Sequence, residues 1–255
     1  MKLRILGCGT STGVPVIGCR CGVCASPHPR NKRTRASVLI ETGKGGENVL
    51  IDTSTDLRAQ ALANGVERLD AVLFTHPHAD HIHGIDELRS FNMLQEGPIP
   101  CYGNSGTINR IRATFEYIFS EEAGESWKPN LTTTLVEGPF SLFGMEVTPL
   151  DVYHGTSSIL GYRIEKAAYV TDCSLIPEES MEKLRGLDVL VLGALRHRPH
   201  PTHFSVRQAL EAVEAIRPKR AVLTHLSHKI DYTVDNRKLP PGVELAYDGM
   251  VIEAE

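Results

Sequence analysis

Four side chains of metal-ligand type fall within six consecutive residues, directly after the apolar run Ala71–Phe74. The six residues are His76-Pro77-His78-Ala79-Asp80-His81. Neutral imidazole nitrogens and carboxylate oxygens are the ligands that borderline divalent metals prefer. Four such groups cannot all face one metal from a regular strand or helix. The pattern therefore predicts a tight loop between a buried strand and a helix, which divides its ligands between two neighbouring metals; Pro77 favours this loop by barring a continued strand.

Three further candidate ligands follow strand-like runs later in the chain. They are His154 after Val147–Val152, Asp172 after Ala168–Val170 and His225 after Ala221–Leu223. A dinuclear site needs ligands from distant parts of the chain. These three residues are therefore the expected remainder of the ligand set.

Short runs rich in valine, isoleucine and leucine recur along the chain and are typical of buried strands. Strands are expected at Leu3–Leu6, Ser37–Glu41, Val49–Ile51, Ala71–Phe74, Met145–Leu150, Gly161–Ile164, Ala168–Val170, Val189–Leu192 and Ala221–Leu223. Helical spacing predicts helices over Ser105–Phe119, Pro177–Leu184 and Val206–Ile216. Because no repeat or long linker divides the chain, we expect one α/β domain over residues 1–255 whose strand ends converge on a site.

Charge and hydropathy exclude several classes of protein. The net charge of −4 over 255 residues disfavours binding of extended nucleic acid. A cluster of basic residues is interpreted as a solvated loop: Arg30, Lys32, Arg33 and Arg35. No apolar run approaches the roughly 18 residues that cross a bilayer, so no membrane association is expected. The first residues show no signal-peptide core, which predicts a cytoplasmic protein with reduced thiols.

The order of these candidates resembles the HxHxDH…H…D…H series of the metallo-β-lactamase fold. The resemblance spans nearly the whole chain and implies an αββα sandwich with the metals at the edge shared by two sheets. It also implies a ligand set carried over position by position. His76, His78 and His154 would hold the first metal, Asp80, His81 and His225 the second, and Asp172 would bridge both.

Two further motifs narrow the resemblance to one branch. His78, the DHIHG sequence and Asp172 disfavour the redox, thioesterase and lactamase branches, respectively. The GCxCxxC motif and the Thr224-His225-Leu226-Ser227-His228 motif together resemble the cyclic phosphodiesterase of the carbon–phosphorus lyase pathway. That family implies a separate zinc site, and the corresponding residues here are Cys19, Cys21, Cys24 and His228. A Cys3His site leaves no position for water and is structural. The alternative is three free cysteines and a surface histidine.

Other residues have weaker motif support. His203 matches a family histidine that acts on the substrate, by protonating the leaving oxygen or stabilising phosphoryl charge, although His197 and His200 lie nearby. Two aspartates are expected to support the site from behind the ligands: Asp52, which resembles the aspartate that orients a metal-bound histidine, and Asp248. The sequence gives no role to Cys173, and leaves open whether the insertion Glu121–Trp127 caps the cleft.

The resemblance implies a metal-dependent phosphodiesterase in which a hydroxide bridging the metals attacks phosphorus. Its expected substrates are small cyclic phosphodiesters, such as 2′,3′-cyclic nucleotides or a ribose cyclic phosphate. Zinc and manganese both accept the predicted ligands at the catalytic pair. Two rivals are an RNA-processing endonuclease resembling the tRNA 3′-end enzymes and a non-catalytic metal carrier on the same scaffold. A homodimer is common in this fold, but no residue of the sequence demonstrates one.

Overall fold

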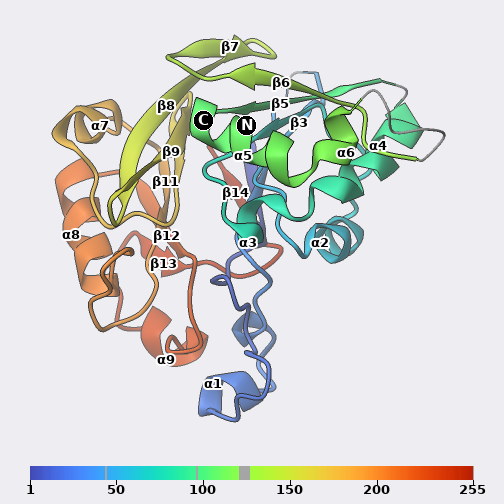
Figure 1. Ribbon diagram of the computed structural model, residues 1–255. Helices are drawn as coiled ribbons and strands as arrows, with labels where there is room; N and C mark the ends of the chain where they lie inside the picture. Colours follow the sequence, from blue (N-terminus) through green and yellow to red (C-terminus); the bar gives the residue numbers. More distant parts are fainter. Residues whose placement is uncertain (44, 96, 121–126, 255) are drawn as a thin grey trace.

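Two mixed sheets lie face to face at the centre of the molecule (Figure 1). The computed structural model describes residues 1–43, 45–95, 97–120 and 127–254, and these residues form two seven-stranded sheets. The first has the order β14-β1-β2-β3-β4-β5-β6, with β1 Lys2–Gly7, β2 Ser37–Glu41, β3 Asn48–Ile51, β4 Ala71–Leu73, β5 Ile99–Gly103, β6 Leu131–Leu135 and β14 Val251–Glu253. The second has the order β13-β12-β11-β10-β9-β8-β7, with β7 Phe140–Leu142, β8 Met145–His154, β9 Ser157–Ile164, β10 Ala167–Val170, β11 Val189–Gly193, β12 Arg220–Thr224 and β13 Val243–Leu245.

Apolar side chains at successive strand positions pack on opposite faces of each sheet, so both faces are buried. In β3, Val49 and Ile51 pack into the core between the sheets, whereas Leu50 packs under the helices of the first sheet. In β10, Tyr169 joins the central core and Val170 the core under the helices of the second sheet. Successive strand residues point to opposite faces, so continuous apolar runs produce three stacked apolar layers.

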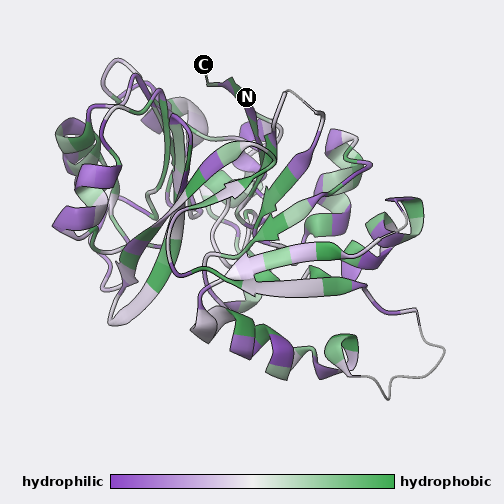
Figure 2. Cartoon of the chain, turned by 90° about the horizontal axis from the view of Figure 1, so that it is seen from above, coloured by the Kyte–Doolittle hydropathy of each residue, from purple (hydrophilic) through white to green (hydrophobic). Residues whose placement is uncertain are grey.

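Helices complete the four layers. On the first sheet lie α2 Leu57–Asn64, α3 Ala79–Ile82, α4 Leu88–Gln95, α5 Ser105–Thr114 and α6 Glu116–Phe119; on the second lie α7 Glu178–Lys183, α8 Val206–Ile216 and α9 Tyr232–Asn236. Short 3₁₀ turns occupy Pro29–Asn31 and Ile85–Glu87. Figure 2 shows hydrophobic residues along the strands and mixed hydropathy on the outer helices. The αββα sandwich predicted from the sequence is confirmed.

Local signals set the bounds of the best-defined helix, α8. Ser205 caps it by accepting a hydrogen bond from the Gln208 amide, and the Gln208 side chain returns to the Ser205 amide. The helix ends at Arg217, which adopts a left-handed conformation before Pro218. The predicted helix Ser105–Phe119 is instead two helices, because the backbone leaves helical geometry at Phe115.

Parallel strands decide where the functional residues meet. In the first sheet β3, β4 and β5 run parallel, and in the second β10, β11 and β12 do. The carboxyl ends of parallel strands lie at one edge of their sheet, and ligands bind beyond that edge. The loops after these six strands therefore converge where the two sheets meet.

An extended arm, residues Gly9–Arg35, leaves the body after β1 and carries the short helix α1 (Gly22–Ala25) at its far end (Figure 1). Arg33 lies inside its base and donates hydrogen bonds to the carbonyl oxygens of Ser227 (3.1 Å) and Ile230 (2.9 Å). The interpretation of the basic cluster as a solvated loop is therefore wrong for Arg33. A guanidinium offers several donors in fixed directions, and here they join two distant chain segments.

Two further observations concern the sequence predictions. Residues 121–126 of the insertion Glu121–Trp127 lie outside the described residues, and Trp127 is exposed. Within the part of the chain that the structure describes, no helix is long and apolar enough to cross a membrane.

Candidate metal centre

Three candidate site residues follow strand ends in the left-handed backbone conformation. The φ angles are 64° at Asp52 after β3, 54° at Asp172 after β10 and 56° at His225 after β12. This conformation is uncommon for residues with a side chain and costs of order 1–3 kcal/mol where it is strained. Packing around the strand ends holds all three residues in it. At each of these three residues the chain turns sharply, and the side chain points towards the edge shared by the two sheets.

The histidine-rich segment forms the predicted strand–loop–helix. His78 precedes α3 as its cap residue, so His76 lies in the loop while Asp80 and His81 lie on the helix. A hairpin of the second sheet closes over this loop: the Leu160 amide donates to the Thr75 carbonyl (3.0 Å) and the Tyr162 hydroxyl to the Phe74 carbonyl (2.8 Å). The second sheet therefore fixes the position of the ligands supplied by the first.

The seven candidate ligands lie together: six have ligand atoms within 3.4 Å of another ligand atom, and the ring of His154 lies 5.0 Å from that of His78. Nε2 of His225 lies 3.1 Å from a carboxylate oxygen of Asp172, and Nε2 of His81 lies 3.4 Å from the other. Nε2 of His81 is also 3.2 Å from Asp80, and Nε2 of His76 is 3.1 Å from Nδ1 of His78. Two ligand atoms bound about 2.1 Å from one metal lie about 3.0–3.4 Å apart at ordinary bond angles. The spacing of the side chains fits shared metal ions.

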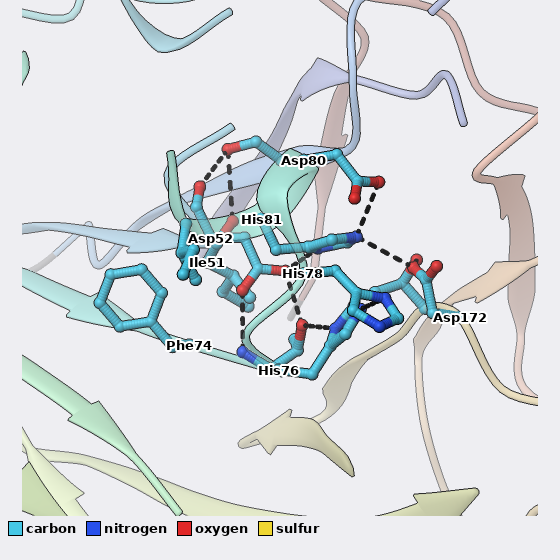
Figure 3. Close-up of polar contacts among 12 residues, drawn as sticks. Ile51, Asp52, Phe74, His76, His78, Asp80, His81 and Asp172 are labelled. Carbon is cyan, nitrogen blue, oxygen red and sulfur yellow. Dashed lines mark hydrogen bonds and ion pairs between the residues drawn. The ribbon is translucent and has the colours of Figure 1, made fainter. Parts of the chain in front are cut away.

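The hydrogen bonds behind His81 direct a lone pair into the cluster. Its Nδ1 donates to Asp52 at 2.7 Å, on the side opposite Asp80 and Asp172 (Figure 3). In the neutral ring Nε2 then carries the lone pair, and this buried nitrogen has no hydrogen-bond partner among the described residues. A lone pair that faces two carboxylates is repelled, so Nε2 either carries a proton, which the raised pKa of the ring favours when no metal is bound, or binds a cation that lies between the carboxylates. The donor set and this orphaned nitrogen therefore fit a divalent metal.

Asp52 also organises His76 through a threonine. It accepts hydrogen bonds from the Thr75 amide and the Thr75 hydroxyl, both at 2.8 Å. Since that hydroxyl donates to Asp52, its oxygen accepts from Nδ1 of His76 at 2.9 Å. Nε2 of His76, which lies 3.1 Å from Nδ1 of His78, then carries the lone pair. The expected contact between Asp52 and a candidate ligand histidine is present, and it extends to a second histidine.

Burial and charge act in opposition within the cluster. Burial alone would raise the pKa of Asp172, but His225 and His81 beside it hold that pKa well below its usual range. Burial alone would lower the pKa of His81, and the carboxylates of Asp172 and Asp52 raise it well above its usual range. The carboxylates of the cluster therefore stay ionised and attract cations.

His154 and His203 lie on the far side of Asp172. Nδ1 of His154 donates to the Thr202 carbonyl at 2.8 Å, leaving Nε2 free. His203 places Nδ1 3.5 Å from Asp172, and its ring is 4.6 Å from that of His154. Burial lowers the pKa of His203 to about 3, so the ring is neutral at pH 7. His154, Asp172 and His203 are close enough to share one ion, which places His203 nearer to the ligands than the sequence suggests.

Three cysteines and a histidine form a second cluster at the end of the arm. Nδ1 of His228 lies 3.3 Å from the sulfur of Cys19, 3.7 Å from Cys21 and 3.5 Å from Cys24. Tetrahedral bonds of about 2.3 Å to sulfur and 2.0–2.1 Å to nitrogen place the ligands about 3.6 Å apart. A hydrogen bond from the Cys24 amide lowers the pKa of Cys21 to about 7, which favours the thiolate that binds zinc. The four side chains fit zinc.

Asp248, which the sequence predicts to support the metal ligands, makes its hydrogen bonds elsewhere. Its carboxylate accepts hydrogen bonds from the Cys8 amide (3.0 Å) and from the Thr34 amide and hydroxyl (both 2.7 Å). None of its hydrogen bonds among the described residues reaches a candidate metal ligand. Asp248 instead closes the base of the arm, where the chain leaves β1 and returns towards β2.

The remaining ambiguous residues have separate positions. Cys173 is buried under the helices of the second sheet, and its carbonyl accepts a hydrogen bond from the Phe204 amide beside His203. His197 is exposed and pairs with Asp235 at 3.2 Å. Nδ1 of His200 faces the Thr202 amide at 3.3 Å. Neither histidine belongs to the ligand cluster.

Comparison with known proteins identifies the family. A model described as a β-lactamase superfamily domain matches residues 47–226, a segment that includes all seven candidate ligands of the metal centre. The chain belongs to the β-lactamase superfamily. A solved structure described as a new diphosphatase from the PhnP family is 42% identical, with a TM-score of 0.93 over 100% of this chain and 98% of that one. The predicted hydrolase class is confirmed.

Two other similar proteins extend the comparison. Zinc-bound PqqB from Methylobacterium extorquens has a TM-score of 0.76 and 22% identity, covering 99% of this chain and 100% of that one, and so shares the fold. An octanoyltransferase from Porphyromonas gingivalis is 39% identical over 254 residues. That alignment covers 98% of this chain and 51% of the relative, so the chain spans about half the length of this curated relative.

Two residues that orient candidate ligands are not identified from the sequence. Thr75 links Asp52 to His76, and the Thr202 carbonyl orients His154. Thr75 could have been noticed, since a hydroxyl directly before a ligand histidine is well placed to contact it. The Thr202 contact depends on a backbone carbonyl, which no residue type reveals.

Proposed function

We propose that the chain is a dinuclear metal-dependent phosphodiesterase that hydrolyses small cyclic phosphodiesters, either 2′,3′-cyclic nucleotides or a ribose cyclic phosphate. The observation that carries the proposal is the convergence of seven candidate ligands at the edge shared by the sheets: six have ligand atoms 3.1–3.4 Å from a neighbour, and the ring of His154 lies 5.0 Å from that of His78. The whole-chain likeness to a PhnP-family diphosphatase supports chemistry at phosphorus.

The ligand roles follow the resemblance found in the sequence, and the grouping of Asp80, His81 and His225 supports the second set. His76, His78 and His154 hold the first metal, Asp80, His81 and His225 the second, and Asp172 lies between them. When bound, zinc or manganese ions lower the pKa of coordinated water and polarise a phosphoryl oxygen. Two divalent ions bring four positive charges, of which Asp80 and Asp172 remove two. The remaining positive charge binds an anionic phosphodiester and stabilises the charge that develops at phosphorus.

The chain's own residues orient this site. Asp52 fixes the ring of His81 and, through Thr75, that of His76. Thr202 fixes His154, and the Thr171 hydroxyl donates to Asp172 at 2.6 Å. Each contact sets which atom faces the cluster before substrate arrives. Because these side chains are already oriented, the activation free energy of the reaction includes no cost for reorienting them.

His203 acts on the substrate in this proposal, as a hydrogen-bond donor to the phosphoryl group or its leaving oxygen. Replacing His203 with glutamine is expected to lower kcat by about 10²-fold, the lower end of what one positioned hydrogen-bond donor to developing charge contributes. Both catalytic metals should remain bound. The measurement combines kcat with metal content, and His197→Gln, a change to an exposed histidine, is the matched control. Loss of one metal would make His203 a ligand, and an unchanged kcat would remove it from the mechanism.

A second candidate reaction is hydrolysis of a diphosphate bond. It is favoured by the 42% identical structure described as a diphosphatase. Both reactions begin with attack of water on phosphorus and differ in the leaving group, which is an alkoxide in one and a phosphate in the other. The same cluster suits both because each transition state gathers negative charge at the phosphoryl oxygens.

Phosphorus NMR separates the two reactions. Protein of known metal content is incubated with 2′,3′-cyclic AMP and, in parallel, with P1,P2-diadenosine 5′-diphosphate. Conversion of the first to a monoester supports the cyclic phosphodiesterase, and selective cleavage of the second supports the diphosphatase. Conversion of neither by fully metallated protein would overturn both substrate proposals.

The Cys3His cluster has a separate role in this proposal. We infer that Cys19, Cys21, Cys24 and His228 bind one structural zinc, because their spacing matches a tetrahedral ion and they offer no position for substrate. The zinc joins the arm to the loop that carries His225.

A further inference from the structure

A cavity of about 400 Å³ is lined by basic side chains outside the candidate metal centre. The described residues that line it are Arg196, His197, Arg198 and Lys229. Its volume lies within the range of small-molecule sites, about 300–1,000 Å³. None of these four residues belongs to a candidate metal-ligand cluster of the described chain. The cavity is therefore a separate place at which a ligand could bind.

Two parallel strands bring the lining residues together. Residues 196–198 lie in the loop after β11, and Lys229 lies in the loop after β12. Because β11 and β12 are parallel neighbours, both loops leave the same edge of the second sheet. The same two loops carry His203 and His225. The cavity is thus bounded by segments that also position candidate site residues.

Hydrogen bonds to the backbone hold the first of these loops in one conformation. Nε of Arg196 donates to the Arg198 carbonyl at 3.1 Å, and its Nη2 donates to the Pro199 carbonyl at 2.8 Å. The Val206 amide donates to the Arg196 carbonyl at 3.0 Å, where α8 begins. A guanidinium has five N–H groups, and those that remain on Arg196 have no partner among the described residues. They are available to a ligand.

The charges around the cavity favour an anion. Two guanidinium groups and one ammonium group line it, and no carboxylate is among its described lining residues. The side chains of Arg198 and Lys229 have no ion pair or hydrogen bond with any described residue. Elsewhere in the chain arginines meet carboxylates, as Arg35 meets Asp56 at 2.9 Å. The positive charges of the cavity lack such a partner.

One carboxylate lies next to the cavity, on α9. Asp235 pairs with His197 at 3.2 Å and with Lys238 at 3.0 Å, and it accepts a hydrogen bond from the Asp231 amide at 2.9 Å. These contacts use both of its oxygens, and Lys238 balances its charge. Asp235 therefore holds His197 in place but does not neutralise the arginines and the lysine that line the cavity.

We propose that this cavity is an accessory site for inorganic diphosphate, separate from the reaction at the metals. The anion carries several negative charges on two linked phosphoryl groups, and the cavity presents three cationic side chains from two loops. A guanidinium binds phosphate oxygens through two parallel hydrogen bonds, and an ammonium adds a point charge. The bound anion joins the loop that carries His203 to the loop that carries His225.

Calorimetry with inorganic diphosphate and the metal-loaded protein tests the site. Arg198→Gln and Lys229→Gln should each raise the Kd about tenfold, the effect of losing one charge-assisted contact. Arg237→Gln removes the same charge from an exposed position outside the cavity and should leave the Kd unchanged. Inorganic phosphate should bind wild type about tenfold more weakly than diphosphate, because it reaches fewer cationic groups. A diphosphate Kd that neither Arg198→Gln nor Lys229→Gln changes would overturn the proposal.

A further variant separates this site from the metal centre. The metal content of each sample is counted after the titration, so that extraction of metal by diphosphate is not taken for binding. Diphosphate bound at the metals should appear as a second event that Asp172→Asn weakens and Arg198→Gln does not. A single event weakened only by Asp172→Asn would place the anion at the metals and overturn the proposal. If the proposed hydrolysis fails instead, the effect of Arg198→Gln on the Kd remains.

Discussion

Asp172→Asn is expected to lower kcat by at least about 10³-fold and to release at least one catalytic metal per chain. The carboxylate of Asp172 lies close to ligands proposed for both metals: within 4.8 Å of His76 and His154 of the first position, and 3.1 Å from His225 of the second. Asparagine keeps the shape but has no negative charge to bridge two cations. Loss of about 4 kcal/mol of transition-state stabilisation corresponds to about 10³-fold in rate.

The measurement is kcat for the better substrate together with metal content of the same sample. Asp151→Asn makes the same chemical change at an exposed position on β8 and should retain both metals and the wild-type rate. Circular dichroism of Asp172→Asn separates loss of the site from loss of the fold. Two retained metals with an undiminished rate would show that Asp172 does not bridge, and the ligand scheme would need a different centre.

The sequence reveals the candidate ligands because their positions follow from strand ends. His76, Asp172 and His225 come after continuous apolar runs, and parallel strands bring such ends to one edge. The backbone conformation that directs these side chains cannot be inferred from the residue types. Asp172 and His225 adopt a left-handed conformation that would be expected of glycine, and only the packed structure stabilises it.

The helices α2 and α4 are not predicted from the sequence, and the reason is physical. In α2 the buried residues are Leu57, Gln60 and Ala61, so the buried face of this helix has only one large apolar side chain. In α4, Met93 and Leu94 are exposed although they are apolar, which obscures the helical period. Sequence periodicity identifies helices whose buried face is uniformly apolar, such as α8.

Arg33 shows a contact that cannot be predicted from the sequence. It belongs to a basic cluster that is interpreted from the sequence as a solvated loop, but it is buried and its partners lie in a distant segment. It donates a hydrogen bond to the Ser227 carbonyl, in the loop after His225. Contacts of this kind depend on tertiary packing, so residue type and spacing do not reveal them.

Cys21→Ser is expected to release one zinc per chain and to lower Tm by about 10 °C. The reason is that zinc holds the arm against His228, and loss of about 4 kcal/mol shifts Tm by about 2–4 °C per kcal/mol in a chain of this size. Catalysis should fall only about tenfold, because the loop after His225 keeps other anchors. The Leu226 amide donates to the Cys8 carbonyl at 2.8 Å, and Arg33 binds Ser227 from the base of the arm.

A mercurial titration with simultaneous detection of released metal measures this zinc without stripping the catalytic ions. Cys8, Cys101 and Cys173 are fully buried, with exposed fractions of 0%, 0% and 1%, and should react slowly. The three cysteines of the arm should react together and release one zinc, with the same stoichiometry in the control Cys101→Ala. Three fast thiols without zinc release would mean that the cysteines are free. Release of the catalytic metals at the same step would instead mean that the zinc holds His225 in place, because the loop's other anchors would then be insufficient by themselves.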